Sequence, residues 1–154
     1  PNGNYTITVT GTDVGSFDLI LSEVTDDGEL SDIESHNSIP ITESGKALVT
    51  VASKQLSSLS LDIEDDGIED IIFAVGEANE EILEYLKAEF ASLDLSEKLT
   101  WTIEQYFALL ESESSEELRM THISQLDRIT RYLTDKEITQ ATANKWRAYM
   151  RNLK

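Results

Sequence analysis

The spacing of apolar residues changes once along this chain, close to Gly76, and that change limits the folds the chain can adopt. Before Gly76, apolar and polar residues alternate in short runs, which is typical of β-strands with one buried face. After Gly76, apolar residues recur at intervals of three and four, which is typical of amphipathic helices. The pattern predicts an α+β fold, in which an N-terminal antiparallel β-sandwich over residues 1–76 precedes a C-terminal four-helix bundle over residues 77–154.

The N-terminal part holds five or six candidate strands, which are separated by turns rich in Gly and Asp. In residues 4–10 the side chains of Tyr5, Ile7 and Val9 share one face, and threonines occupy the other. Pro40 interrupts a weaker segment, which is therefore predicted to be an edge strand. The candidate strands cover residues 4–10, 16–24, 31–41, 46–52, 57–61 and 71–75. Short strands at this spacing indicate an antiparallel β-sandwich.

The C-terminal part contains four apolar stripes at helical spacing. Ser114 with Glu117, and Thr134 with Glu137, have the spacing of capping boxes, which predicts that the third helix begins near 115 and the fourth near 135. The residues expected to be buried are Ile82, Tyr85, Leu86, Phe90 and Leu93; Leu99, Ile103, Tyr106, Phe107 and Leu110; Leu118, His122 or Ile123, Leu126, Ile129 and Leu133; and Ile138, Ala141, Trp146, Tyr149 and Leu153. Four such helices with short joints make a small bundle.

Residues 62–70, between the last two candidate strands, place oxygen ligands at the spacing of a calcium loop. Ca²⁺ takes six to eight hard oxygens from a flexible loop, and a glycine permits the sharp turn that such a loop needs. Gly67 is the sixth residue of this loop, and Phe73 stands where an EF-hand carries its twelfth-position Glu, so the loop is not an EF-hand. The predicted Ca²⁺ ligands are Asp62, Glu64, Asp66, the backbone carbonyl of Ile68, and Asp70. The alternative is a tight acidic hairpin that binds no ion.

The acidic loop resembles the D-x-D-x-D-G-x-x-D loops found between strands in thrombospondin-type and integrin-type repeats and in secreted bacterial modules, although Glu64 stands where Asp or Asn is usual. The preceding run, GNYTITVTGTDVGSFDL at residues 3–19, resembles β-sandwich modules appended to secreted bacterial hydrolases and surface proteins. This resemblance covers residues 1 to about 75. Further strands usually precede the run in such modules, which implies that the chain begins inside the domain and leaves one sheet edge unpaired.

The helical part resembles the FIMAH domain, a C-terminal helical module of bacterial extracellular enzymes and surface proteins. The resemblance covers residues 79–153 and rests on four short stretches, at residues 93–96, 99–110, 126–133 and 136–139. The basic, glycine-containing turn of that family is replaced here by Leu-Thr-Asp-Lys at residues 133–136. The resemblance implies a helical bundle and an extracellular setting.

The chain carries 30 Asp and Glu residues against 12 Lys and Arg residues, a net charge of −18. Such acidity argues against binding nucleic acid or anionic membranes, although the chain could imitate a nucleic acid toward a basic protein. Residues 76–118 hold 12 acidic and 2 basic residues, whereas residues 119–154 hold 3 acidic and 8 basic residues. Antiparallel helices drawn from these two segments would attract one another.

Cysteine is absent, so the chain can form no disulfide, thiolate metal site or Cys nucleophile. No apolar run approaches the ~20 residues of a membrane span, so membrane insertion is not expected. No signal peptide is present, and the chain opens at Pro1 without Met. These features predict a fragment of a larger protein, whose localisation signal lies upstream.

Groups suited to catalysis are sparse. His36 and His122 fall in different halves of the chain, and each is expected to be a surface residue; no G-x-S-x-G motif occurs. The clustered carboxylates belong to a hairpin rather than a cleft, so glycoside hydrolysis is not expected. Trp101, Trp146 and Tyr149 are expected to pack in the core rather than to form a sugar-binding platform. The chain is therefore predicted not to be an enzyme.

These observations lead to one main interpretation and two alternatives. The main interpretation is a non-catalytic, calcium-binding accessory region of a larger bacterial extracellular or cell-surface protein. Its expected partners are the upstream part of its own polypeptide and, beyond that, another surface protein or a polysaccharide. The first alternative is an acidic protein-interaction or inhibitor domain that imitates nucleic acid. The second is the C-terminal fragment of a secreted hydrolase.

Overall fold

The computed structural model describes residues 4–153, apart from the side chain of Glu77, and divides the chain into two compact units, Pro1–Glu81 and Ile82–Lys154. The first unit is built from strands and the second from helices, as the change of period near Gly76 predicts. The elements are β1 (Tyr5–Thr10), β2 (Gly15–Val24), β3 (Leu30–Ile41), β4 (Lys46–Ala52), β5 (Gln55–Leu56), β6 (Leu59–Asp62), β7 (Ile71–Phe73), β8 (Gly76–Glu77), α1 (Asn79–Ala91), α2 (Glu97–Ser112), α3 (Glu116–Leu133) and α4 (Gln140–Asn152). The division between the units falls inside α1, beyond the predicted boundary at residue 76.

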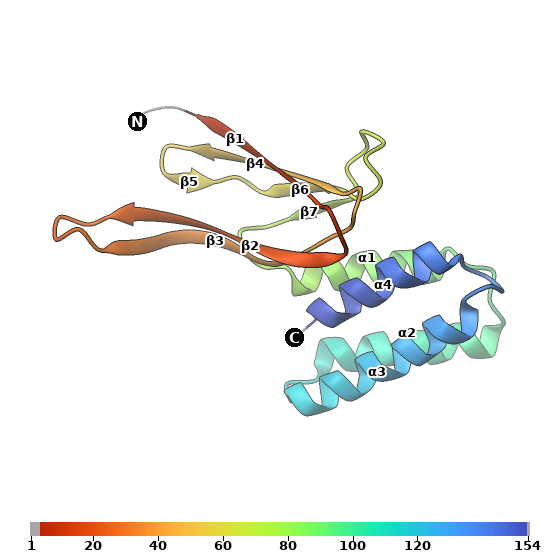
Figure 1. Ribbon diagram of the computed structural model, residues 1–154. Coiled ribbons are helices and arrows are strands. Elements are labelled where there is room, and N and C mark those ends of the chain that lie inside the picture. The colour runs from red at the N-terminus through yellow and green to blue at the C-terminus, as the bar shows by residue number, and fades with distance from the viewer. Residues whose placement is uncertain (1–3, 154) are drawn as a thin grey trace. The chain divides into compact units, whose positions relative to one another are not determined.

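The strands form two sheets, which lie as two layers in the N-terminal unit (Figure 1). The five-stranded sheet has the order β1-β4-β6-β7, with β5 on β4, and the three-stranded sheet has the order β2-β3-β8. All pairs are antiparallel except β3 with β8, where His36 is opposite Gly76. The fully buried side chains of Ile39, Leu59 and Phe73 belong to both sheets, so the α+β class with an N-terminal sandwich is confirmed.

The third strand lies in the middle of its sheet, so the prediction of an edge strand is wrong. β3 pairs with β2 on one side and with β8 on the other. However, β8 reaches only as far as Asn37, so β3 has a partner on one side only at Pro40. Proline, which has no backbone N–H, is tolerated where a strand has such a free side. Pro40 therefore marks a locally free edge on a strand that is central elsewhere.

The four helices of the C-terminal unit pack through aromatic and ionic contacts. Phe90 of α1 meets Phe107 of α2 and Trp146 of α4, with ring centroids 5.7 and 4.4 Å apart. Arg147 of α4 donates to Asp127 of α3 at 2.7 Å. This last contact joins opposite charges on neighbouring helices. Among the helices of residues 4–153, none has both the length and the apolar character needed to cross a membrane.

Several side chains expected in the helical core are exposed instead. Trp101 is 60% exposed and Leu118 48% exposed, and Ala141 also faces solvent. Trp146 and Tyr149 are buried, as predicted. The inward face of α3 carries Ile123, Leu126, Thr130 and Leu133. The polar Thr130 is therefore fully buried, and its hydroxyl donates to the carbonyl of Leu126 at 3.0 Å. A Thr hydroxyl can be buried here because the helix itself supplies its acceptor.

The observed helix caps differ from the predicted capping boxes. Ser115 rather than Ser114 caps α3, and Thr139 rather than Thr134 caps α4. The start of α4 is displaced because residues 134–138 form a tight turn, in which the carbonyl of Leu133 accepts hydrogen bonds from three successive N–H groups of residues 136–138. The spacing of Thr134 and Glu137 is thus used in a turn instead of a helix.

Replacing Leu126 and Leu118 of α3 by alanine tests which face of this helix is buried. Leu126 is fully buried, so Leu126→Ala should lower the free energy of unfolding by about 2–5 kcal/mol. Leu118→Ala should change it by no more than about 0.5 kcal/mol, because that side chain is largely exposed. Urea denaturation of both variants measures the difference. Equal losses would show that the face of α3 has been misassigned.

Candidate functional site

The acidic loop at residues 62–70 joins β6 to β7 and is fixed at both ends by the core. In the β6–β7 pair, Leu59 is opposite Phe73 and Leu61 is opposite Ile71. All four side chains are buried, whereas residues 64–70 are all exposed. The buried side chains of β6 and β7 therefore anchor the hairpin, and the acidic residues between the two strands extend into solvent.

Asp62, at the end of β6, organises the loop through its carboxylate. Its Oδ1 accepts the backbone N–H of Asp66 at 3.2 Å, and its Oδ2 accepts that of Gly67 at 2.8 Å. Gly67 has a φ of +85°, a conformation that suits glycine. Desolvation raises the pKa of Asp62, but backbone N–H groups, Gly67 first among them, outweigh this effect and hold the pKa below its usual value. The ionised form of Asp62 is thus the form that the loop stabilises.

The other predicted ligands are also engaged by the loop itself. Oδ1 of Asp66 accepts the N–H of Ile68 at 2.8 Å, and Oδ2 of Asp70 accepts the N–H of Ile63 at 2.7 Å. The side chain of Ile68 is 66% exposed, and Glu64 is exposed as well. These bonds close a compact hairpin with several backbone donors directed at carboxylates.

The loop brings six acidic residues into one exposed hairpin, and Lys46 of β4 compensates one of them. Its Nζ lies 2.6 Å from Asp65, which has a φ of +55°. Within residues 4–153, no three His, Cys, Asp or Glu side chains converge closely enough to hold a metal ion. A carboxylate oxygen that accepts one N–H retains a second lone pair, so the predicted ligands keep coordinating capacity. Calcium binding at this hairpin therefore remains a prediction.

His36, expected at the surface, is completely buried in the N-terminal unit. Its Nε2 lies 2.9 Å from the carbonyl oxygen of Ser57, which can only accept, so Nε2 donates. His36 is thus a buried residue of β3, and its Nε2 links this strand to the segment at Ser57 by a hydrogen bond. His122 of α3 is half-buried, and its ring centroid lies 6.1 Å from that of Tyr106 of α2. Alternating strand pattern alone did not reveal the burial of His36, because its inward neighbours are polar.

A groove between α1 and α2 is the feature that the sequence analysis missed. It has a volume of about 470 Å³, and both apolar and charged side chains line it. One signal in the sequence points to it: Glu97, Glu104 and Glu111 recur every seven residues on α2, so they share one face of that helix. This acidic face of α2 lies beside the buried face of the same helix, which carries Phe107.

Comparison with protein families, with curated proteins and with solved structures finds no match to this chain. The resemblances to secreted β-sandwich modules and to the FIMAH domain therefore stay predictions.

The pKa of Asp62 gives the hairpin a testable pH dependence. Because this pKa is lower in the folded chain than the ordinary value of 3.8, the stabilisation by Asp62 is present above the ordinary value and is lost as pH falls through the folded pKa. In NMR spectra, the amide proton of Gly67 should shift with a midpoint below 3.8, the ordinary value for Asp. Asp62→Asn should remove this titration. A midpoint at or above 3.8 would contradict the geometry of the loop.

Proposed function

We propose that this chain is a non-catalytic accessory region of a larger bacterial extracellular or cell-surface protein, and that its β6–β7 hairpin binds Ca²⁺. The observation that carries the proposal is the hairpin itself, which holds six acidic residues in an exposed loop anchored at both ends by buried strand residues. The extracellular and bacterial setting is supported only by the resemblance of the sequence to secreted modules.

Electrostatic repulsion is the physical reason to expect a cation here. Like charges close together disfavour ionisation unless an opposite charge or hydrogen-bond donors compensate them. In this loop, Asp62 has backbone donors and Asp65 has Lys46, yet the loop as a whole stays strongly negative. Carboxylate and carbonyl oxygens are also the ligands that Ca²⁺ prefers.

The geometry of the loop favours weak binding. Asp62 and Asp70 sit beside the strand ends and are held by bonds to backbone N–H groups, while Glu64 and Asp66 lie on the exposed turn between them. Coordination needs these four carboxylates to turn toward a common point, and ordering side chains and backbone costs free energy. We therefore expect a Kd on the order of 10⁻⁴ to 10⁻³ M, as in extracellular calcium modules.

The role of such a site would be structural. Binding to the folded hairpin alone stabilises the fold by mass action. The hairpin joins two strands of the five-stranded sheet, so stabilising it favours the sheet as a whole. The two histidines serve packing and helix contacts in the described chain, which supports an accessory rather than a catalytic role.

Thermal unfolding of the whole chain in EDTA and in excess Ca²⁺ tests the proposal. At a Ca²⁺ concentration ten times Kd, the folded state should gain about 1.4 kcal/mol, which raises Tm by several degrees. Mg²⁺ should have little effect, because it demands a stricter octahedral geometry. Asp66→Ala should abolish the response to Ca²⁺.

Asp26→Ala is the matched control, because Asp26 is an exposed acidic residue of the β2–β3 turn, outside the hairpin. This variant should respond to Ca²⁺ as the unchanged chain does. If Asp66→Ala and Asp26→Ala lose the response equally, Ca²⁺ only screens the net charge. If the unchanged chain shows no response, the hairpin binds no calcium.

A further inference from the structure

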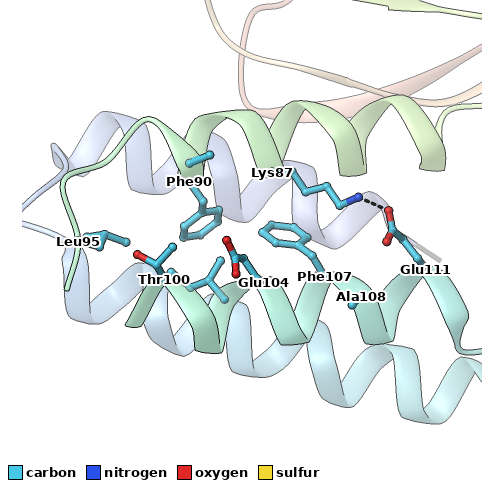
Figure 2. A pocket seen from close by; sticks show the side chains of 10 residues that line it. Lys87, Phe90, Leu95, Thr100, Glu104, Phe107, Ala108 and Glu111 are labelled. Carbon is cyan, nitrogen blue, oxygen red and sulfur yellow. Dashed lines mark hydrogen bonds and ion pairs between the residues drawn. The ribbon is translucent and has the colours of Figure 1, made fainter. Parts of the chain in front are cut away.

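The groove between α1 and α2 has an apolar floor. Phe90 of α1 and Phe107 of α2 meet edge to face at its base, and Ile103 lies beside them; each of these side chains is 3–4% exposed. Figure 2 shows the two rings between the helices, with Leu95 and Thr100 at one end of the groove. The ring of Phe90 also packs on the buried Trp146, so the floor is part of the core of the helical unit.

Small side chains leave space above this buried floor. Ala91 of α1 and Ala108 of α2 line the groove, and both are exposed. A longer side chain at either position would reach over the floor. The volume of about 470 Å³ is thus maintained by two alanines on facing helices.

The rim of the groove is acidic and only partly neutralised. Lys87 reaches across the groove to Glu111 (Figure 2). Lys87 also contacts Glu84 on its own helix. Glu104 lies between the two phenyl rings in this view, and its carboxylate makes no ion pair or hydrogen bond with any residue in the described part of the chain. Two turns of helix separate Glu104 from Glu111, a rise of about 10.5 Å.

An exposed tryptophan borders the same face. Trp101 is 60% exposed and precedes Ala108 by seven residues, so the two side chains lie almost in line along α2. Exposed Trp residues are frequent anchors of protein interfaces. The groove is therefore flanked by an aromatic side chain that the core does not use.

We propose that the α1–α2 groove binds a basic amphipathic helix of a partner protein. Charge complementarity carries the proposal, because Lys or Arg residues spaced by two turns would meet Glu104 and Glu111. Apolar residues between them would pack on Ala91, Leu95 and Ala108, which line the groove above the buried rings. Thr100 to Glu111 spans about 16 Å of helix, which matches about three turns of such a partner. The inference does not depend on calcium binding by the β6–β7 hairpin.

Lys87 acts as an internal counterion at this site. Its Nζ occupies the position beside Glu111 that a basic side chain of the partner would take. Binding would therefore either displace Lys87 or use Glu104 alone. Removing the charge of Lys87 should strengthen binding, which is the opposite of what the loss of a purely structural ion pair would do.

The probe is a fluorescein-labelled amphipathic helix of about 18 residues, made of Leu and Lys, whose binding to the whole chain is followed by fluorescence anisotropy. A scrambled peptide of the same composition controls for general attraction to an acidic protein. Anionic vesicles serve as a second control, because the acidic rim should repel them. The amphipathic peptide should bind, and binding should weaken as salt concentration rises.

Variants locate the binding to the groove. Glu104→Gln should weaken binding about threefold, and Lys87→Gln should strengthen it by a similar factor. Ala108→Leu should weaken it about tenfold by filling the groove, and Trp101→Ala should weaken it as well. The matched controls are Glu137→Gln and Ala141→Leu, at exposed positions outside the groove, which should leave binding unchanged.

Several outcomes would overturn the proposal. Equal binding of the scrambled peptide, or equal effects of Glu104→Gln and Glu137→Gln, would mean that general acidity alone attracts the probe. Binding that is indifferent to Ala108→Leu would place the peptide elsewhere, and no binding at all would reject the groove as a docking site. Circular dichroism of each variant establishes that the helices remain folded.

Discussion

An excess of carboxylates over cationic side chains, 30 against 12, is the constraint to which the rest of this structure answers. A carboxylate that lacks a cation can still be stabilised by hydrogen-bond donors, and backbone N–H groups are the donors that every chain has. In the N-terminal unit, the carboxylates that accept a backbone N–H include Asp13, Asp18, Glu34, Asp62, Asp66, Asp70 and Glu81. Turns and strand ends therefore form around acidic side chains.

In the helical unit, carboxylates are stabilised by helix dipoles and by basic side chains. The first turns of α1, α2 and α3 carry Glu residues, where the helix dipole favours negative charge. Basic residues of the last two helices then meet acidic ones: Arg147 and Arg131 both contact Asp127, and Lys145 lies 3.8 Å from Glu89. Of these three contacts, only the one between Lys145 and Glu89 joins the acidic segment 76–118 to the basic segment 119–154, while both contacts of Asp127 lie within the basic segment.

The sequence predicts the class of fold and the approximate position of nearly every element, because burial imposes a period of two or 3.6 on strong apolar runs. The sequence predicts the position and exposure of a residue less well where an interaction other than burial of an apolar face decides them. Pro40 suggests an edge, yet only the last part of β3 is free on one side. Trp101 has helical spacing, yet it faces solvent because Phe107 and Ile103 already fill the inward face of α2.

Of the candidate functional sites, one could be predicted from the sequence and one could not. The acidic hairpin could be located from the sequence, since its six acidic residues fall within residues 62–70 and its flanks alternate. The hydrogen bonds that Asp62 and Asp70 accept within the loop could not be predicted from the sequence. At the same spacing, a carboxylate can accept a backbone N–H or coordinate an ion. The groove was hidden for a different reason: Phe90 and Phe107 are distant in sequence and meet only when α1 and α2 pack.

The two proposals, for the hairpin and for the groove, use acidic side chains in different ways. In the hairpin, the acidic residues follow one another in a short loop whose oxygens can turn toward one point, which suits a small, hard cation. On α2, the helix holds Glu104 and Glu111 about 10.5 Å apart, too far to share one ion. Charges at that separation beside an apolar floor suit a partner whose cations are spaced by its own helix. The backbone that carries the carboxylates, more than their number, decides which kind of cation each surface can accept.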